Sequence, residues 1–288
     1  MLPRISLVAS VLLGGFAIAS AAQAAPITVT TTNNATTLAQ TLVGSGITIS
    51  NATYTGNSAS AGTFTGGSSA SLPINQGILL TSGLAASAGT SYTGDGPSTD
   101  VGGAGSALIP NSHDATTLTF DFTSSSTTAS FSYFFASTEY QGYVNSSYND
   151  LFAFLFNGEN IAKVPGTDLD VAVNNVNNGG PTAPGTNPSN PQYFVSNATG
   201  QNPNVPYGGY TTLFTASISG LTPGAVNSLT LVIADVTDSV LDSAVFLQAG
   251  SFTDQPAPTP VPEPASAALF GAGLLGLAMV RRRAGMQR

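Results

Sequence analysis

The sequence predicts an all-β protein: a single, jelly-roll-like β-sandwich that is exported and carries one short N-terminal helix. Short segments of alternating or continuous apolar residues recur along the chain, separated by turns rich in Gly, Asn, Ser and Thr, a pattern typical of a sandwich. Hydrophobic residues make up 42% of the chain and charged residues 7%, a balance that favours a packed core over disorder. We expect one sandwich domain over residues 25–253, a length that suits one large β core.

The first 24 residues have the features of a secretory signal peptide. One basic residue, Arg4, precedes a mostly apolar stretch over residues 5–19. Ala22-Gln23-Ala24 then supplies the small-x-small pattern that signal peptidase recognises. We expect signal peptidase to cleave after Ala24, so that the mature chain is exported. A transmembrane helix is the weaker interpretation, because the apolar stretch is short and a cleavage site follows it.

One helix is expected, over residues 34–43. Asn34 is placed to cap its first turn, and Leu38 and Leu42 lie four residues apart on one face. Gly44 follows as a stop signal.

The predicted strands are short and rich in β-branched and aromatic residues. Leu118, Phe120 and Phe122 alternate with polar residues, so we expect one face of that strand to be buried and the other hydrated. Strands are predicted over residues 47–54, 77–81, 116–122, 130–136, 151–156, 161–164, 171–176, 213–219, 229–234 and 244–252.

Asn157-Gly158 is the strongest hairpin signal in the chain, because a two-residue turn needs positive φ at both central positions. It predicts a hairpin between residues 151–156 and 161–164. Residues 89–110 and 177–206 are rich in Gly, Pro, Asn and Ser and are expected to be long loops within one sandwich rather than linkers between two domains.

The C-terminal residues are organised as an anchoring tail. Residues 254–260 are rich in proline and predict an extended spacer. The 16 residues from 265 to 280 are uncharged; as a helix they reach about 24 Å, which only marginally spans a hydrocarbon core of roughly 30 Å. We expect one C-terminal transmembrane helix whose basic cluster stays cytoplasmic, with the preceding domain on the other side. That cluster is Arg281, Arg282 and Arg283.

The tail, residues 261–288, resembles the PEP-CTERM sorting signal of Gram-negative bacteria. The resemblance rests on Val261, Pro262, Glu263 and Pro264, followed by the apolar span and the basic cluster. It implies recognition and cleavage by an exosortase. The protein would then pass through the inner membrane and reach the cell surface or the extracellular matrix. The alternative is a plain transmembrane anchor.

Charge is distributed unevenly between the tail and the exported part. Residues 25–260 carry 13 acidic residues and one basic residue, Lys163, which gives a net charge of −12. Such a surface repels phosphates, so we expect no nucleic-acid partner. The chain has no cysteine, which excludes disulfides and thiolate chemistry.

The exported part resembles the choice-of-anchor L domain of bacterial surface proteins. This resemblance covers most of residues 47–252 and implies no known reaction. Relatives often carry Ser-Glu-Glu-Tyr where this chain has Ser137-Thr138-Glu139-Tyr140, so one carboxylate is absent. The segments that carry the resemblance are residues 77–83, 134–140, 160–162, 165–167 and 235–246.

Acidic residues lie where predicted strands meet loops, and they suggest a calcium site. Ca²⁺ takes six to eight oxygen ligands from carboxylates, amides and carbonyls, although the spacing matches no EF-hand. The alternative is that Asp235, Asp238 and Asp242 accept backbone N–H groups and cap turns. The candidate calcium ligands are Glu139, Asn149, Asp150, Asp235, Asp238 and Asp242.

The same region of the sequence suggests two other kinds of site. Glu139 and Asp150 could act as the paired carboxylates of a secreted glycoside hydrolase, but the chain has no Trp for sugar stacking and we expect no enzymatic activity. Tyr140, Tyr143 and Tyr148 lie in one predicted loop and could contact a glycan or protein if they are exposed.

These observations predict an exported protein that is anchored at the cell surface or released into the matrix. We expect a structural or adhesive role, with exopolysaccharide or the biofilm matrix as partner; the matrix link comes from the resemblance of the tail. The alternatives are a carbohydrate-binding module without catalysis and the hydrolase described above.

Overall fold

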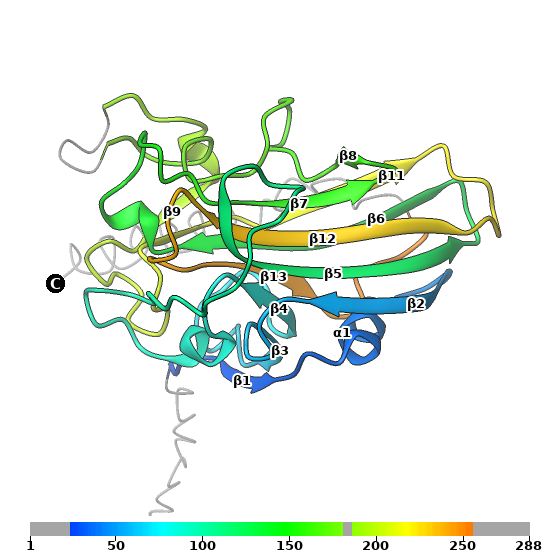
Figure 1. Cartoon of the computed structure of the whole chain (residues 1–288), viewed down its shortest axis with the longest axis horizontal. Helices are drawn as coiled ribbons and strands as arrows, with labels where there is room; N and C mark the ends of the chain where they lie inside the picture. The colour runs from blue at the N-terminus through cyan, green and yellow to red at the C-terminus, as the bar shows by residue number, and fades with distance from the viewer. Residues whose placement is uncertain (1–23, 181–185, 256–288) are drawn as a thin grey trace, which may run out of the picture.

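Figure 1 shows the computed structural model, which describes residues 24–180 and 186–255. Two antiparallel sheets pack face to face, with one short α-helix at an end of the sandwich. The predicted all-β sandwich is therefore confirmed. The predicted signal peptide apart from its last residue, most of the spacer and the whole sorting tail lie outside the described residues. Within the described residues, no helix is both long and apolar enough to cross a membrane.

The first sheet has eight strands and is covered on both faces. Its order is β1-β3-β4-β13-β6-β10-β9, and β11 also pairs with β6. Residues 66–76 and 197–207 contribute Ile74 and Tyr207, among others, to a second apolar cluster on its outer face, so all of β4 is buried. The strands are β1 (Thr28–Thr31), β3 (Ala61–Thr65), β4 (Gly77–Thr81), β6 (Thr128–Ser137), β9 (Phe194–Ser196), β10 (Gly209–Thr211), β11 (Phe214–Ser219) and β13 (Ser243–Gln248).

The second sheet has five strands in the order β2-β5-β12-β7-β8. Burial alternates along β5, where Leu118, Phe120 and Phe122 point into the core and Thr117 and Thr119 point away from it, as the sequence pattern predicts. The strands are β2 (Ile47–Thr55), β5 (Ser112–Ser124), β7 (Leu151–Phe156), β8 (Glu159–Asn160) and β12 (Asn227–Val236).

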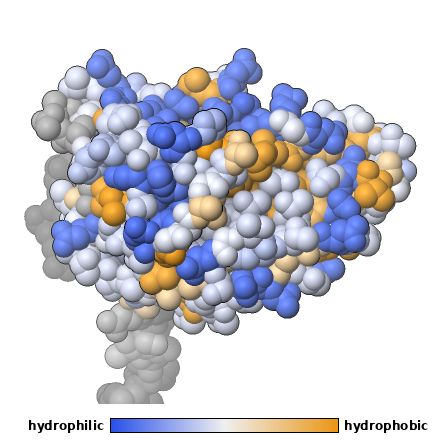
Figure 2. Space-filling view, in the orientation of Figure 1, coloured by the Kyte–Doolittle hydropathy of each residue, from blue (hydrophilic) through white to orange (hydrophobic). Residues whose placement is uncertain are grey.

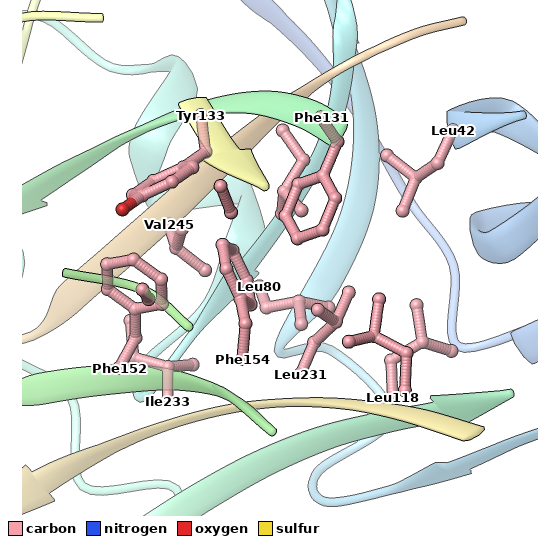
Figure 3. Close-up of a cluster of buried hydrophobic side chains, with 14 of the residues drawn as sticks. Leu42, Leu80, Leu118, Phe131, Tyr133, Phe152, Phe154, Leu231, Ile233 and Val245 are labelled. Carbon is pink, nitrogen blue, oxygen red and sulfur yellow. The ribbon is translucent and has the colours of Figure 1, made fainter. Parts of the chain in front are cut away.

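Aromatic side chains from both sheets fill the space between them. Phe131 and Tyr133 of β6 face Phe152 and Phe154 of β7 (Figure 3). The ring centroids of Phe131 and Phe154 are 4.7 Å apart and those of Tyr133 and Phe154 are 4.9 Å apart, both in edge-to-face geometry. Pairs of this kind stabilise the fold by about 0.5–1.5 kcal/mol beyond the area they bury.

The helix α1 (Ala35–Leu42) covers one end of this core, as predicted. Asn34 Oδ1 accepts the N–H of Thr37 at 2.9 Å, which satisfies one of the free donors of the first turn. Leu38 and Leu42 are buried against the sandwich. Three 3₁₀ helices lie in the longer loops: η1 (Ala85–Gly89), η2 (Glu139–Gln141) and η3 (Pro191–Tyr193).

The predicted hairpin is present, but its second arm is shorter and begins earlier than expected. Asn157 has φ 52° and Gly158 has φ 83°, the positive values that a two-residue turn requires. The arm after the turn is β8 and not residues 161–164. Asn160 Oδ1 accepts the N–H groups of Phe154 and Ala162, so a side chain replaces the next backbone partner and the ladder ends.

The strand predicted over residues 171–176 is wrong. Val171, Val173 and Val176 are buried in the main core, but the backbone turns there, with the N–H groups of Asn175 and Val176 both directed to the carbonyl of Ala172. Four strands were not predicted, namely β1, β3, β9 and β10.

Candidate functional site

Four acidic side chains are buried together at one end of the sandwich. Glu139 follows β6, Asp150 precedes β7, Asp235 lies near the end of β12, and Asp242 precedes β13. Each is at most 1% exposed. We call these four residues the acidic cluster, and we call this end of the sandwich the loop end, because the long connections before β5 and β7 meet there.

Asp150 connects the two sheets. Its Oδ1 accepts the backbone N–H of Val236 in β12 at 2.9 Å, and its Oδ2 accepts the hydroxyl of Ser243, the first residue of β13, at 2.7 Å. Burial raises the pKa of Asp150, while these two hydrogen bonds act in the opposite direction. Both carboxyl oxygens therefore hold structure in place.

Asp235 has no such partners. It lies at a bulge in β12, where the pairing with β5 shifts between Ile233 and Asp235. Its side chain is fully buried, and neither carboxyl oxygen has a hydrogen-bond partner. Burial raises the pKa of Asp235, and the neighbouring charge of Asp150 raises it further. Two adjacent buried carboxylates repel each other strongly. A proton shared between the carboxyl groups of Asp150 and Asp235 contributes to the pKa of both, and without that proton a cation must balance their charge.

Asp242 has one satisfied and one unsatisfied oxygen. Oδ1 accepts the N–H of Thr99 at 2.7 Å. Oδ2 has no partner and faces Gly83, where an added Cβ would lie 1.7 Å from it. Burial raises the pKa of Asp242 to about 6, with a contribution from the charge of Asp114.

Glu139 begins the short helix η2. Its backbone N–H donates to the hydroxyl of Ser137 at 3.0 Å, while its Oε2 has no partner. Burial, followed by the charges of Asp150 and Asp238, raises the pKa of Glu139 to about 9. At neutral pH this side chain is therefore a neutral acid.

The described residues supply no basic partner to the acidic cluster. Lys163 binds Asp170 at 2.6 Å, and both side chains are more than a third exposed. His113, on β5, is also exposed. Because buried charge is costly unless it is paired, the cluster requires neutralisation by protons or by an ion from outside the chain.

The six predicted calcium ligands separate into two groups. Asn149 Oδ1 accepts the N–H of Asn174 at 2.8 Å, and Asp238 Oδ1, partly exposed, accepts the N–H of Val240 at 3.4 Å. Both side chains therefore accept backbone N–H groups in loops. For Asp238 this is the turn-capping role that the alternative interpretation predicts. The other four form the acidic cluster. Across residues 24–180 and 186–255, no three acidic or histidine side chains are arranged so that they could hold a metal ion as they stand.

The three predicted ligand-binding tyrosines do not share one environment. Contrary to the expectation of exposure, Tyr140 is buried, with its ring 4.6 Å from that of Phe194. It packs inward between Phe194, the first residue of β9, and Phe135 of β6. Tyr143 is 42% exposed and forms an edge-to-face pair with Tyr148 at 5.2 Å. Of the three predicted tyrosines, Tyr143 and Tyr148 are the two that offer aromatic surface to a ligand.

A hollow of about 530 Å³ lies near the loop end, but the acidic cluster does not line it. Its walls come from the end of β2, the loop over residues 101–107 and the start of β5. No acidic, basic or histidine residue lines it. Glu139 and Asp150 are thus separate from this hollow.

Sequence reasoning missed the polar residues that surround the cluster. Ser82 Oγ accepts the N–H of Ser243 at 3.0 Å, and Thr81 Oγ1 donates to the carbonyl of Ser243 at 2.7 Å. All three are fully buried. The sequence offered a way to find these residues, because each lies at the end of an apolar strand or directly beside it, in a segment that carries the family resemblance.

Comparison with known proteins gives two matches. The PEP-CTERM protein-sorting motif matches residues 260–283, so this is an exported protein that is sorted to the cell surface, and the motif implies processing by an exosortase. No curated protein and no solved structure matches the chain. The choice-of-anchor L domain matches residues 27–253, which includes both sheets and the acidic cluster, and the chain therefore belongs to the choice-of-anchor L family.

Proposed function

We propose that this protein is a non-catalytic structural or adhesive component of the exopolysaccharide or biofilm matrix of a Gram-negative bacterium. The observation that carries the proposal is the order of the two matched regions, a β-sandwich followed directly by a sorting motif. In this proposal signal peptidase removes the first 24 residues, the C-terminal helix holds the chain in the inner membrane, and an exosortase releases the sandwich for surface or matrix attachment.

The outer face of the five-stranded sheet supports an adhesive role, apart from the region where Ile109 packs over Val232 and Ala153. Thr53 of β2, Thr119 of β5 and Thr230 of β12 lie side by side across three strands, and the hydroxyls of Thr119 and Thr230 are 3.0 Å apart. Figure 2 shows much of this face as a pale area of intermediate hydropathy. We call it the hydroxyl face; its hydroxyl side chains are Thr48, Ser50, Thr53, Thr55, Thr117, Thr119, Thr123, Ser228 and Thr230.

Polysaccharide suits such a face better than protein or nucleic acid. Hydroxyl groups both donate and accept hydrogen bonds, as sugar hydroxyls do, and rows of them repeat at the spacing of the strands, about 4.8 Å. The one charged side chain among them is Asp121, which accepts a hydrogen bond from Asn51. The second candidate function, a carbohydrate-binding module, uses this same face together with Tyr143 and Tyr148.

The absence of catalysis is part of the proposal. Glu139 and Asp150 are each 1% exposed, whereas a glycosidase must bring both of its carboxyl groups to a bound sugar. Asp150 is also committed to Val236 and Ser243. An active glycosidase would require the loop end to open.

The first test is the mass of the mature protein in the inner membrane, the outer surface and the medium. A product that ends near Pro264 in the surface or medium fraction is expected. A product that keeps Arg281 to Arg288 and stays in the inner membrane would mean that the tail is only an anchor, and the matrix role would lose its support.

The second test is co-sedimentation with the exopolysaccharide of the producing strain. The double variant Thr119→Val, Thr230→Val removes two central hydroxyls with little change of shape and should weaken binding by about tenfold, since each lost hydrogen bond costs about 0.5–1.5 kcal/mol. Thr215→Val, an exposed position on β11 in the other sheet, is the matched control and should bind normally. Equal binding by all three proteins would exclude the hydroxyl face.

A further inference from the structure

Unsatisfied polar atoms are concentrated in the acidic cluster. The described residues contain nine buried side-chain nitrogen or oxygen atoms without a hydrogen-bond partner, and four of these are carboxyl oxygens of Glu139, Asp235 and Asp242. Folded proteins leave few buried polar groups unpaired, and each one calls for an explanation. Four carboxyl oxygens at one end of a sandwich indicate a common cause.

Among these groups, Asp235 has the most unpaired oxygen atoms. Both of its oxygens are unpaired and its side chain is 0% exposed. The hydroxyl of Ser82 and the carboxyl of Asp150 lie close enough to affect its pKa through hydrogen bonding, and the charges of Asp150 and Asp242 raise that pKa. The unpaired carboxyl is therefore surrounded by oxygen atoms, with no basic side chain among them.

We propose that Asp150 and Asp235 bind one hard divalent cation of the size of Ca²⁺. Two carboxylates balance its charge, and the hydroxyls of Ser82 and Ser243, backbone carbonyls and water are the neutral oxygens that complete its coordination. No three acidic side chains converge, so the site depends on neutral ligands. Calcium accepts such mixed and irregular oxygen sets, whereas Mg²⁺ demands a small regular octahedron. Zinc is disfavoured because the site offers no Cys or His.

The position of this site gives the ion a structural task. Asp235 belongs to β12 in the five-stranded sheet, and Asp150 directly precedes β7 in the same sheet. Ser243 and Ser82 belong to the β13 and β4 side of the eight-stranded sheet. A bound cation would therefore join the two sheets at the loop end, where apolar contacts give way to long loops.

The backbone beside the site is strained in the manner of a ligand-binding loop. Between β12 and β13, Thr237 has φ 87° and Leu241 has φ 65°. Positive φ is unfavourable for a β-branched residue such as Thr237, and strain of this kind is often held at binding sites. The same loop carries Asp242, whose free oxygen adds negative charge near the ion.

The test is calcium titration of the exported protein after treatment with EDTA and removal of the chelator. Calorimetry should detect one Ca²⁺ per chain with a Kd of about 10⁻³ M or tighter, the range of extracellular calcium modules. Saturating Ca²⁺ should raise the melting temperature by several degrees over the EDTA-treated protein, and equal Mg²⁺ should have a much smaller effect.

Two variants locate the site. Asp235→Asn should weaken Ca²⁺ binding at least tenfold and abolish the calcium-dependent rise in melting temperature. Asp168→Asn removes an exposed acid that does not belong to the acidic cluster and should behave as the wild type. A calcium response that survives in Asp235→Asn would overturn the proposal.

The wild-type comparison decides the question even if Asp235→Asn does not fold. Identical melting curves in EDTA and in millimolar Ca²⁺, together with no heat of binding, would mean that protons alone neutralise the pair. The inference does not rest on the proposed matrix role, because it is measured on the isolated protein.

Discussion

The two ends of the sandwich are built in different ways. At one end, on the right in Figure 1, the connections are tight: residues 125–127 join β5 to β6, residues 220–226 join β11 to β12, and Asn157-Gly158 joins β7 to β8. At the loop end, on the left, residues 82–111 lead to β5 and residues 138–150 lead to β7. The acidic cluster lies at the loop end. The tight end buries one acid, Asp254, whose carboxyl accepts the hydroxyl of Ser125.

The two ends also differ in the residues that adopt positive φ. At the tight end, positive φ is carried by residues that tolerate it, such as Gly158, Gly220 and Gly224. At the loop end it is carried by Thr237 and Leu241, which do not tolerate it readily. The turns of the tight end are explained by the conformational preferences of their own residues. The loop end holds positive φ at two residues that disfavour it, together with buried carboxyl oxygens that have no hydrogen-bond partner.

The largest expected loss of stability comes from a substitution in the hydrophobic core, which lies between the two ends. Phe154→Ala should lower the free energy of unfolding by about 3–5 kcal/mol, because it removes a fully buried ring and leaves a cavity. Phe154 contacts the rings of Phe131, Tyr133 and Phe152. Urea unfolding followed by circular dichroism measures this loss. A change below 1 kcal/mol would mean that the sheets repack freely, and the core could not then serve as the rigid reference for the two ends.

The next effect tests the loop end directly. Gly83→Ala should cost about 1–3 kcal/mol, the usual penalty of overpacking, because its Cβ would lie 1.7 Å from Asp242 Oδ2. Asp242 must move and would lose the N–H of Thr99. Gly158→Ala is the control at the tight end, since no atom lies within 4 Å of its added Cβ and only its positive φ is penalised. Equal losses in the two variants would contradict the close packing of Asp242.

How far the sequence predicts this molecule also differs between the ends. Helix α1, the Asn157-Gly158 turn and the alternation along β5 follow from local patterns, and the structure has them. Three of the four missed strands, β1, β3 and β10, are short and rich in Thr or Gly, so their local patterns are weak. β1 and β10 gain their place by pairing with β3 and β6, which are far from them in the sequence. Residues 171–176 fail for the opposite reason: their valines are buried as a strand's would be, yet Asn174 and Asn175 bind neighbouring backbone groups and turn the chain.

At the acidic cluster, composition predicts the chemistry but not the burial. Asp235 and Asp238 are three residues apart and look equivalent in the sequence. The bulge after Ile233 leaves Asp235 completely buried, while Asp238 lies partly exposed in the loop and caps Val240. A bulge depends on register between distant strands, so no local pattern distinguishes the two residues.

The third prediction concerns pH at the loop end. The pKa of Glu139 is raised from 4.5 to about 9, first by burial and then by Asp150 and Asp238. The folded state keeps this proton while the unfolded chain releases it, so the stability that it provides is full below pH 4.5 and is lost as pH rises toward 9. Glu139→Gln, which is neutral at every pH, should flatten this dependence and gain about 1 kcal/mol or more at pH 8.

Thermal melts in EDTA from pH 4 to pH 9 measure this slope. Asp121→Asn, on the hydroxyl face, is the control and should keep the wild-type slope. If Glu139→Gln melts in parallel with the wild type at every pH, Glu139 is ionised in the folded protein, and the loop end is more hydrated than its burial implies.

The smallest expected effect concerns helix α1 at the tight end, where the cost of a substitution should depend on local helix capping alone. Asn34→Ala removes the acceptor of the Thr37 N–H and should cost about 0.5–2 kcal/mol, the usual value of an N-cap. Asn34→Asp restores an acceptor and should recover most of the loss, whether measured by urea or by heat. Because α1 lies far from the acidic cluster, this loss should be the same in EDTA and in Ca²⁺. A loss that depends on Ca²⁺ would show that the two ends are coupled through the core. The tight end and the loop end could then no longer be treated as independent.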